Sequence, residues 1–216
     1  MKDRISVKII NLARRQDRRE ECRKEMAAIG WGEDDYAFFT ARDMPGAGAR
    51  GCSLSHGKVI ADFLFAEEKP FLLVLEDDFS ICAAADFFSS LEAAIAQPGF
   101  WDVLLLAHTF AVPIMRTPIQ DTFRVINAQT TSGYLVGRLY ASKLMEIFFR
   151  SAEMLDRVKK IPSPAREMAD TRYRCDILWK HLQDKDRFCA KIPATIIQRP
   201  SYSDVENKQV DYNNNP

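Results

Sequence analysis

The sequence predicts an α/β protein with a mostly parallel central sheet flanked by helices, and three observations support this class. Short apolar runs alternate with stretches of helical periodicity through residue 150, which is typical of layered α/β folds. Residues 71–75 are apolar at every position, as in central strands of parallel sheets, which are buried on both faces. With 47% hydrophobic and 28% charged residues, the composition excludes a mostly disordered chain, a collagen and a coiled coil.

The first third of the chain is predicted to alternate between strands and helices. Residues 5–12 are rich in β-branched side chains, which indicates a buried strand. Residues 17–30 carry apolar side chains at helical spacing and end in glycine, which predicts a helix with a glycine stop. We then expect a short strand at 36–40, a glycine-rich loop at 42–51 and a second helix at 53–68, which the following proline ends.

The middle third continues the same alternation. Residues 71–75 form the predicted central strand, and residues 86–96 have the periodicity of a third helix. A further buried strand is expected at 103–106, a strand at 132–136 and a helix at 140–149.

The pattern is weaker in the remaining segments. Residues 108–124 contain two prolines and are expected to be irregular. Residues 161–174, with prolines and mixed charges, are predicted to be a mobile loop that could order over a bound ligand as a lid. A short helix is expected at 176–182, a late strand at 192–197 and a polar tail from 201 to 216.

Length and charge exclude several function classes. The 216 residues fit a single domain, and 30 basic residues against 30 acidic ones disfavour a nucleic-acid binder that relies on a basic field. No apolar run reaches the ~18 residues of a membrane-spanning helix, and the first residues do not resemble a signal peptide. The cysteines have no metal-ligand spacing, so buried thiols in a reducing cytosol are expected, at Cys22, Cys52, Cys82, Cys175 and Cys189.

The strongest chemical feature is a run of three carboxylates, Glu76, Asp77 and Asp78, directly after the predicted central strand. Like charges this close repel one another, and a divalent cation such as Mg²⁺ or Mn²⁺ would neutralise them. The place also fits a ligand site, because open α/β sheets bind ligands at the carboxyl ends of their strands. A solvated acidic turn that caps a helix accounts for these residues equally well.

A glycine pattern at residues 46–51 satisfies G-x-G-x-x-G and precedes a predicted helix. A dinucleotide-binding turn needs a strand running into the first glycine and an acidic residue about 20 positions later. Four residues separate this segment from the preceding strand, and the apolar strand at 71–75 occupies the later position. A flexible entry to the helix is therefore the favoured interpretation.

One histidine and a cluster of arginines each allow a functional and a structural interpretation. His56, in the first turn of the second predicted helix, could contact a phosphate or sugar or could be a structural residue hydrogen-bonded to the sheet. An arginine cluster after the first strand could bind a diphosphate, but a solvated helix face is favoured for most of its members, which are Arg14, Arg15, Arg18 and Arg19.

These segments, in this order, resemble glycosyltransferase family 25, which includes bacterial lipopolysaccharide galactosyltransferases and collagen β-galactosyltransferases. The matching segments are residues 9–12 with Arg15 and Arg18, 51–56, 75–78, and 133–136 with Ala141 and Leu144. Weaker matches follow at Asp176 and at residues 198–204. The likeness spans residues 5–206 and is specific through the order of its motifs.

The resemblance implies a GT-A-like nucleotide-sandwich fold and an inverting transfer of a sugar, usually galactose, from a UDP-sugar to a hydroxyl of a glycan or glycoconjugate such as lipopolysaccharide. It places donor binding in residues 1–137 and the acceptor side in 138–216. Glu76 and Asp78 would hold Mn²⁺ or Mg²⁺. The implied donor-binding residues are Asn11, Leu12, Arg18, His56, Asp77, Gly133 and Tyr134.

A catalytic base must face the sugar from the side opposite the metal, so Glu76 and Asp78 are poor candidates. Asp176 is the expected base, with Asp204 and Asp170 as substitutes. The sequence departs from the family pattern at Ala49 and Arg50, where an acidic residue is common, and in 171–175, which lack the usual proline.

Two other functions stay open. A metal-dependent phosphohydrolase could use the same carboxylates to activate water. A non-catalytic nucleotide-sugar-binding relic would fit the departures at Ala49 and Arg50. Whichever function holds, including that of a transferase, we expect a cytoplasmic protein. A transferase acting on lipid-linked glycans would need a peripheral contact at the inner face of a membrane.

Overall fold

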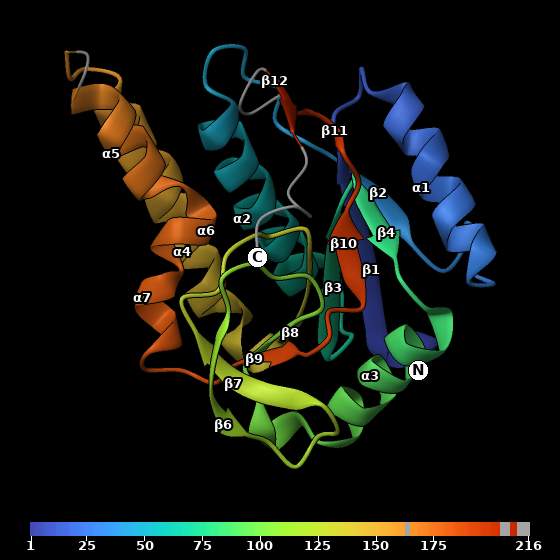
Figure 1. Cartoon of the computed structure of the whole chain (residues 1–216). Coiled ribbons are helices and arrows are strands. Elements are labelled where there is room, and N and C mark those ends of the chain that lie inside the picture. Colours follow the sequence, from blue (N-terminus) through green and yellow to red (C-terminus); the bar gives the residue numbers. More distant parts are fainter. Residues whose placement is uncertain (163–164, 204–207, 211–216) are drawn as a thin grey trace.

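Eight strands form the central sheet of the protein (Figure 1). The computed structural model describes residues 1–162, 165–203 and 208–210. The spatial order of the strands is β2 (Ala37–Thr40), β1 (Ile5–Asn11), β3 (Phe71–Glu76), β8 (Gly133–Gly137), β5 (Val103–Leu105), β9 (Phe188–Lys191), β7 (Thr122–Ile126) and β6 (Val112–Arg116).

Parallel pairing joins β1 to β2 and β3, and β5 to β9, whereas β8 and β7 run against both of their neighbours. All the other strands of this sheet therefore point the same way, and the predicted α/β class with a mostly parallel central sheet is confirmed.

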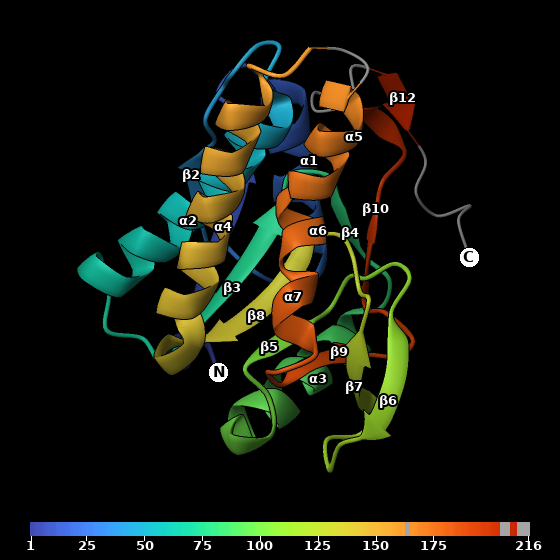
Figure 2. The same cartoon turned by 90° about the vertical axis from the view of Figure 1, so that its left-hand side faces the viewer.

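Helices cover both faces of this sheet (Figures 1 and 2). One face packs against α1 (Gln16–Ala28) and α3 (Ala84–Ala96). The other face packs against α2 (Gly48–Ala66), α4 (Arg138–Val158), α6 (Cys175–Leu178) and α7 (Lys180–Gln183). The two-stranded pair β10 (Ile196–Gln198) with β4 (Phe79–Ile81) packs into the core of the α1–α3 face through Phe79 and Ile196. The remaining elements are α5 (Ala165–Tyr173), the 3₁₀ turns Lys2–Arg4 and Pro98–Phe100, and the pair β11 (Ser201–Ser203) with β12 (Lys208–Val210). None of the described helices is long and apolar enough to cross a membrane.

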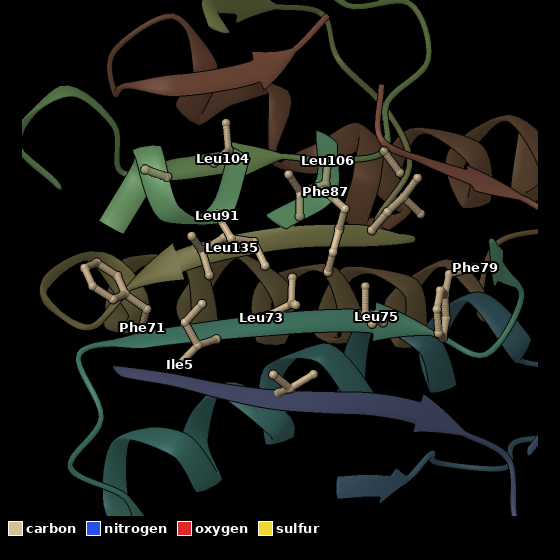
Figure 3. Close-up of a cluster of buried hydrophobic side chains, with 14 of the residues drawn as sticks. Ile5, Phe71, Leu73, Leu75, Phe79, Phe87, Leu91, Leu104, Leu106 and Leu135 are labelled. Atoms are coloured by element: carbon tan, nitrogen blue, oxygen red, sulfur yellow. The ribbon is translucent and has the colours of Figure 1, made fainter. Parts of the chain in front are cut away.

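Strand β3 shows how the sequence builds the core. Phe71, Leu73 and Leu75 face the α1–α3 layer, where they meet Phe87 and Leu91 of α3 (Figure 3). The intervening leucine and valine of β3 pack against the α2–α4 layer. Full burial of one such side chain contributes roughly 1.5–3 kcal/mol. The alternation of a strand thus distributes one apolar run between two cores.

Polar residues from several strands lie at one edge of the sheet, where the parallel strands end. Strands β1 and β3 end there with Asn11 and Glu76, and β5 ends at the same side. Because β8 is antiparallel, the residues before it, Thr131 and Ser132, reach this edge as well, and the N–H of Glu76 donates to the carbonyl of Ser132 at 3.0 Å. This is the edge where open α/β sheets bind their ligands.

The expectation of an irregular segment at 108–124 is wrong, since β6 and most of β7 lie there as a hairpin. Pro113 is compatible with β6 because β6 is the edge strand of the sheet, where a missing N–H is tolerated. The strand is exposed along its whole length, which removes the apolar signal by which buried strands are recognised.

The expected mobile loop at 161–174 is also wrong for residues 165–173, which form α5. This helix has no buried residue, so its sequence carries no apolar periodicity. The glycine-rich loop at 42–51 ends earlier than expected, because α2 begins at Gly48.

The late strand expected at 192–197 is confirmed only at residues 196–197, which begin β10, and β9 precedes the expected range. Part of the polar tail pairs as β11 and β12. The other tail residues, 204–207 and 211–216, lie outside the described residues. The predicted glycine stop of α1 is confirmed, because Gly30 follows the helix with φ +80°.

Candidate functional site

A cavity of about 610 Å³ opens over the polar edge of the sheet. Its walls come from segments far apart in the chain: the ends of β1 and β3, the residues before β8, the start of α2, and α6. The charged residues that line it are Arg14, Arg18, Arg42, Asp43, Glu76, Asp77, Asp78, Arg174 and Asp176. Both signs of charge therefore meet in one hollow, as binding of a phosphorylated ligand together with a cation requires.

Asp77 is committed to an internal ion pair. Its Oδ1 accepts a hydrogen bond from Nη1 of Arg18 at 2.5 Å, and its Oδ2 accepts one from Nδ2 of Asn11 at 2.8 Å. Arg18 is only 8% exposed, although a solvated face was the favoured interpretation for most of its cluster. An unpaired buried guanidinium would cost several kcal/mol, so Asp77 and Arg18 stabilise one another.

The backbone of the carboxylate turn is held from both sides. Nη2 of Arg199 donates to the carbonyl of Asp77 at 2.9 Å, and the backbone N–H of Arg199 donates to the carbonyl of Asp78 at 2.7 Å. From α1, the thiol of Cys22 donates to the carbonyl of Asp77 at 3.3 Å. These contacts fix the turn between α1 and the strand β10.

Glu76 is held by a buried polar network. Nε2 of His56 lies 3.0 Å from its Oε1, and the hydroxyl of Thr131 donates to the same oxygen. Nδ1 of His56 lies 3.0 Å from the hydroxyl of Tyr134, so both ring nitrogens have a partner and the imidazole bridges Glu76 and Tyr134. Burial alone would raise the pKa of Glu76, but the hydrogen bonds from His56 and Thr131 hold it below its usual value.

The carboxylate of Asp78 is only weakly hydrogen-bonded. Its Oδ2 lies 3.7 Å from Nη1 of Arg18 and accepts a long hydrogen bond of 3.5 Å from Gln198. Its Oδ1 is buried and accepts no hydrogen bond from any described residue. Burial, with the nearby charge of Glu76, raises the pKa of Asp78 to about 7. Such a carboxylate requires either a proton or a cation.

This donor set fits a hard divalent cation. Asp78 offers an unsatisfied oxygen, and no described residue donates to the second oxygen of Glu76. Ligand atoms of Cys52, His56 and Glu76 also lie within 4.8 Å of one another, but His56 and Glu76 are hydrogen-bonded to each other. The pKa of Cys52 is raised by its contact with Cys175 and by burial, so its thiol stays protonated. A soft-metal site at this second cluster is therefore disfavoured.

Asp176 lines the same cavity from the first turn of α6. Burial raises its pKa and the charge of Glu76 adds to this, while the backbone N–H of Thr130 opposes it. A carboxylate with a raised pKa is a stronger base than an ordinary one, which suits removal of a proton from a hydroxyl.

The structure separates the predicted site residues into two groups. The cavity is lined by Leu12, Arg18, His56, Glu76, Asp77, Asp78 and Asp176. Asn11 and Tyr134 lie behind the wall, where they hold Asp77 and His56, and Gly133 lies against Ile196, since a Cβ there would come within 2.7 Å of that side chain. Of the substitute bases, Asp204 lies outside the described residues, and Asp170 lines a second cavity.

Thr131, Arg42 and Arg174 belong to the cavity but were not expected there. Arg42 and Arg174 stand in polar segments whose composition resembles any solvated loop or helix. Thr131 has one sequence signal, its place directly before the strand 132–136, but only the antiparallel orientation of that strand brings it to Glu76.

Comparison with known proteins gives no sequence-level relative: no family model and no curated protein matches the chain. Solved structures do match over most of the chain, at low identity. A197 from STIV is 13% identical, with a TM-score of 0.46, over 96% of this chain and 93% of its own. A glycosyltransferase involved in the glycosylation of the major capsid of PBCV-1 is 12% identical, with a TM-score of 0.46, over 94% and 96%. Mannose-1-phosphate geranyltransferase from Thermus thermophilus is 9% identical, with a TM-score of 0.45, over 87% and 73%.

Proposed function

We propose that the protein is an inverting, metal-dependent glycosyltransferase of the family 25 type. It would move a sugar, with galactose expected first, from a UDP-sugar to a hydroxyl of a glycan or glycoconjugate such as lipopolysaccharide. One observation carries the proposal: a single cavity holds Asp78, with its unsatisfied buried oxygen, beside Glu76 and the candidate base Asp176.

Each part of the cavity has a role in this reaction. Asp78 and Glu76 would hold Mn²⁺ or Mg²⁺, which when bound supplies positive charge to the diphosphate of the donor. Arg18, fixed by Asp77, adds a cation to the same wall. His56 and Thr131 keep Glu76 ionised and immobile, so its orientation is set before the donor binds.

Asp176 would take the proton of the acceptor hydroxyl as its oxygen attacks the anomeric carbon. The new bond joins that oxygen to the anomeric carbon, and the bond from the anomeric carbon to the phosphate oxygen breaks, with UDP leaving on the opposite face. Attack from the far side inverts the configuration, as in the single-displacement hydrolysis of glycosides.

The test is thermal unfolding with UDP, UDP-galactose, UDP-glucose, GDP and NAD, each with Mn²⁺ or with EDTA. A ligand at 100 times its Kd stabilises by about 2.7 kcal/mol, and each kcal/mol raises the Tm of a chain this size by roughly 2–4 °C. We expect a rise with uridine nucleotides that EDTA removes. No shift with any uridine nucleotide would contradict the proposal.

Asp78→Asn provides the matched variant. It should abolish the Mn²⁺-dependent shift with UDP while leaving the unliganded fold intact, and an unchanged affinity for UDP and Mn²⁺ would contradict the metal assignment. Release of phosphate from nucleotides at full rate without any acceptor would instead indicate a phosphohydrolase. Binding of UDP that ignores the metal would indicate a non-catalytic relic.

A further inference from the structure

A second cavity of about 510 Å³ lies beside the first, between the start of α2, the end of α4 and α5. Gly46, Thr171 and Arg174 line both cavities, so the two hollows are adjacent. Arg174 precedes Asp176 by two residues. A ligand with its reacting hydroxyl at Asp176 therefore has this second cavity next to it.

The second cavity has an apolar floor and a basic rim. Leu155 and Val158 of α4 form the floor and are each 2% exposed. The rim carries four cations against two carboxylates, and these residues are Arg50, Lys159, Arg166, Arg174, Glu167 and Asp170. A positive excess over an apolar floor suits a sugar that carries an anionic group.

The basic side chains of the rim differ in whether a carboxylate lies close enough to neutralise their charge. Arg50 pairs with Asp156 at 3.0 Å, and Arg174 lies 3.7 Å from Asp170. Lys159 and Arg166 make no ion pair with any carboxylate of the described residues. Glu167 is likewise in no ion pair among the described residues, and with Asp156 counted the rim keeps an excess of one positive charge, which Lys159 and Arg166 provide.

We propose that the second cavity binds an anionic group, a phosphate or a carboxylate, on the acceptor glycan. This inference rests on the proposed transferase function, because that function makes the ligand at Asp176 an acceptor. The donor diphosphate belongs at Asp78 and Glu76 in the first cavity, so the anion in the second cavity would be a separate one. Lys159 and Arg166 would select acceptors that carry it.

The experiment is calorimetric titration of the protein with glucose 6-phosphate, glucuronate and glucose, with and without UDP and Mn²⁺. Charge-assisted hydrogen bonds favour the two anionic sugars by roughly tenfold or more in Kd over glucose. The variant K159A/R166A should remove this preference without changing the shift in Tm caused by UDP. The control R157A/R172A removes equal charge from exposed positions of α4 and α5 that line neither cavity, and it should keep the preference.

Equal binding of charged and neutral sugars, or no binding of either, would overturn the proposal, as would a preference that survives K159A/R166A. Vesicles of phosphatidylcholine with and without phosphatidylglycerol test a lipid as the source of the anion. If K159A/R166A weakens binding to the anionic vesicles but leaves binding of the sugars unchanged, the site recognises a membrane surface and the proposal is wrong. A UDP shift that is absent while the sugar preference persists would refute the transferase function but not the anion site.

Discussion

The carboxylate of Asp78 is buried but accepts few hydrogen bonds. Arg18 and Gln198 approach only one of its oxygens, at 3.7 and 3.5 Å, and burial outweighs this weak attraction. Removing water from a charged carboxylate without replacing its hydrogen bonds is costly. In the absence of a cation, Asp78 therefore lowers the stability of the folded protein.

The pH dependence of stability tests this residue. The pKa of Asp78 is about 7 when folded, against ~3.9 for an unfolded aspartate. The folded state holds this proton longer, so the contribution of Asp78 to stability is most favourable below pH 4, falls as the pH rises to 7 and is level above that. The difference between the Asp78→Asn variant and the parent isolates this contribution from that of the other carboxylates. With EDTA present, Asp78→Asn should lack this fall and should exceed the parent by about 2–4 kcal/mol at pH 8.

Urea unfolding between pH 4 and pH 8 is the measurement. Asp34→Asn, an exposed position, serves as the control and should follow the parent curve. Parallel curves for Asp78→Asn and the parent would show that Asp78 is ionised in the folded protein without a cation.

Tyr134 anchors the imidazole that holds Glu76. Tyr134→Phe keeps the ring in the core but leaves Nδ1 of the fully buried His56 without its partner. An unsatisfied buried group of this kind costs about 1–3 kcal/mol. Tyr36→Phe, a buried tyrosine away from the cavity, should cost less in the same urea titration, and equal costs would argue against the network.

At the scale of elements, the start of α2 decides the shape of the cavity. Gly51 lies in its first turns, and a Cβ there would come within 2.5 Å of the carbonyl oxygen of Arg42. Since that atom belongs to the backbone, the segment that follows β2 and lines the cavity would have to move. The glycine thus permits close contact between the helix and the cavity wall.

Gly51→Ala should therefore lower both stability and UDP affinity, although alanine is the better helix former by about 1 kcal/mol. Gly99→Ala is the control, because nothing lies within 4 Å of its added Cβ. The comparison requires Tm and the Kd for UDP of both variants. If Gly51→Ala is as stable as the parent, the backbone at Arg42 can move away from the added Cβ without loss of stability, and the prediction is wrong.

The predictability of each element follows from its burial. Strand β3 and the acidic turn after it were predicted because a fully buried strand is apolar throughout and the charges end it abruptly. Helix α5 was missed because it buries nothing, and β9 because four residues are too few for a periodic signal. The contact between Arg18 and Asp77 spans 59 residues, so only the folded chain reveals it.

At the scale of the whole molecule, β6 leaves one edge of the sheet open. Val112, Ile114 and Met115 on this strand are each about half exposed. An exposed apolar edge strand is a template for pairing with another chain. We expect reversible association at high concentration through this edge.

Ile114→Lys should suppress this association, measured by light scattering against concentration, without changing the Tm. Gln120→Lys adds the same charge to the turn between β6 and β7 and is the control. Equal suppression by both variants would point to net charge rather than to the edge strand.

The position of β9 has a consequence for synthesis on the ribosome. This strand lies between β5 and β7, although about sixty residues separate it from β7 in the chain, and it is what joins the β6–β7 hairpin to the rest of the sheet. Until residues 188–191 emerge, a nascent chain exposes two unpaired strand edges. The strands that precede β9 in the chain must therefore wait for residues 188–191 before the sheet closes, and chaperones that shield open strand edges should bind the chain during that interval.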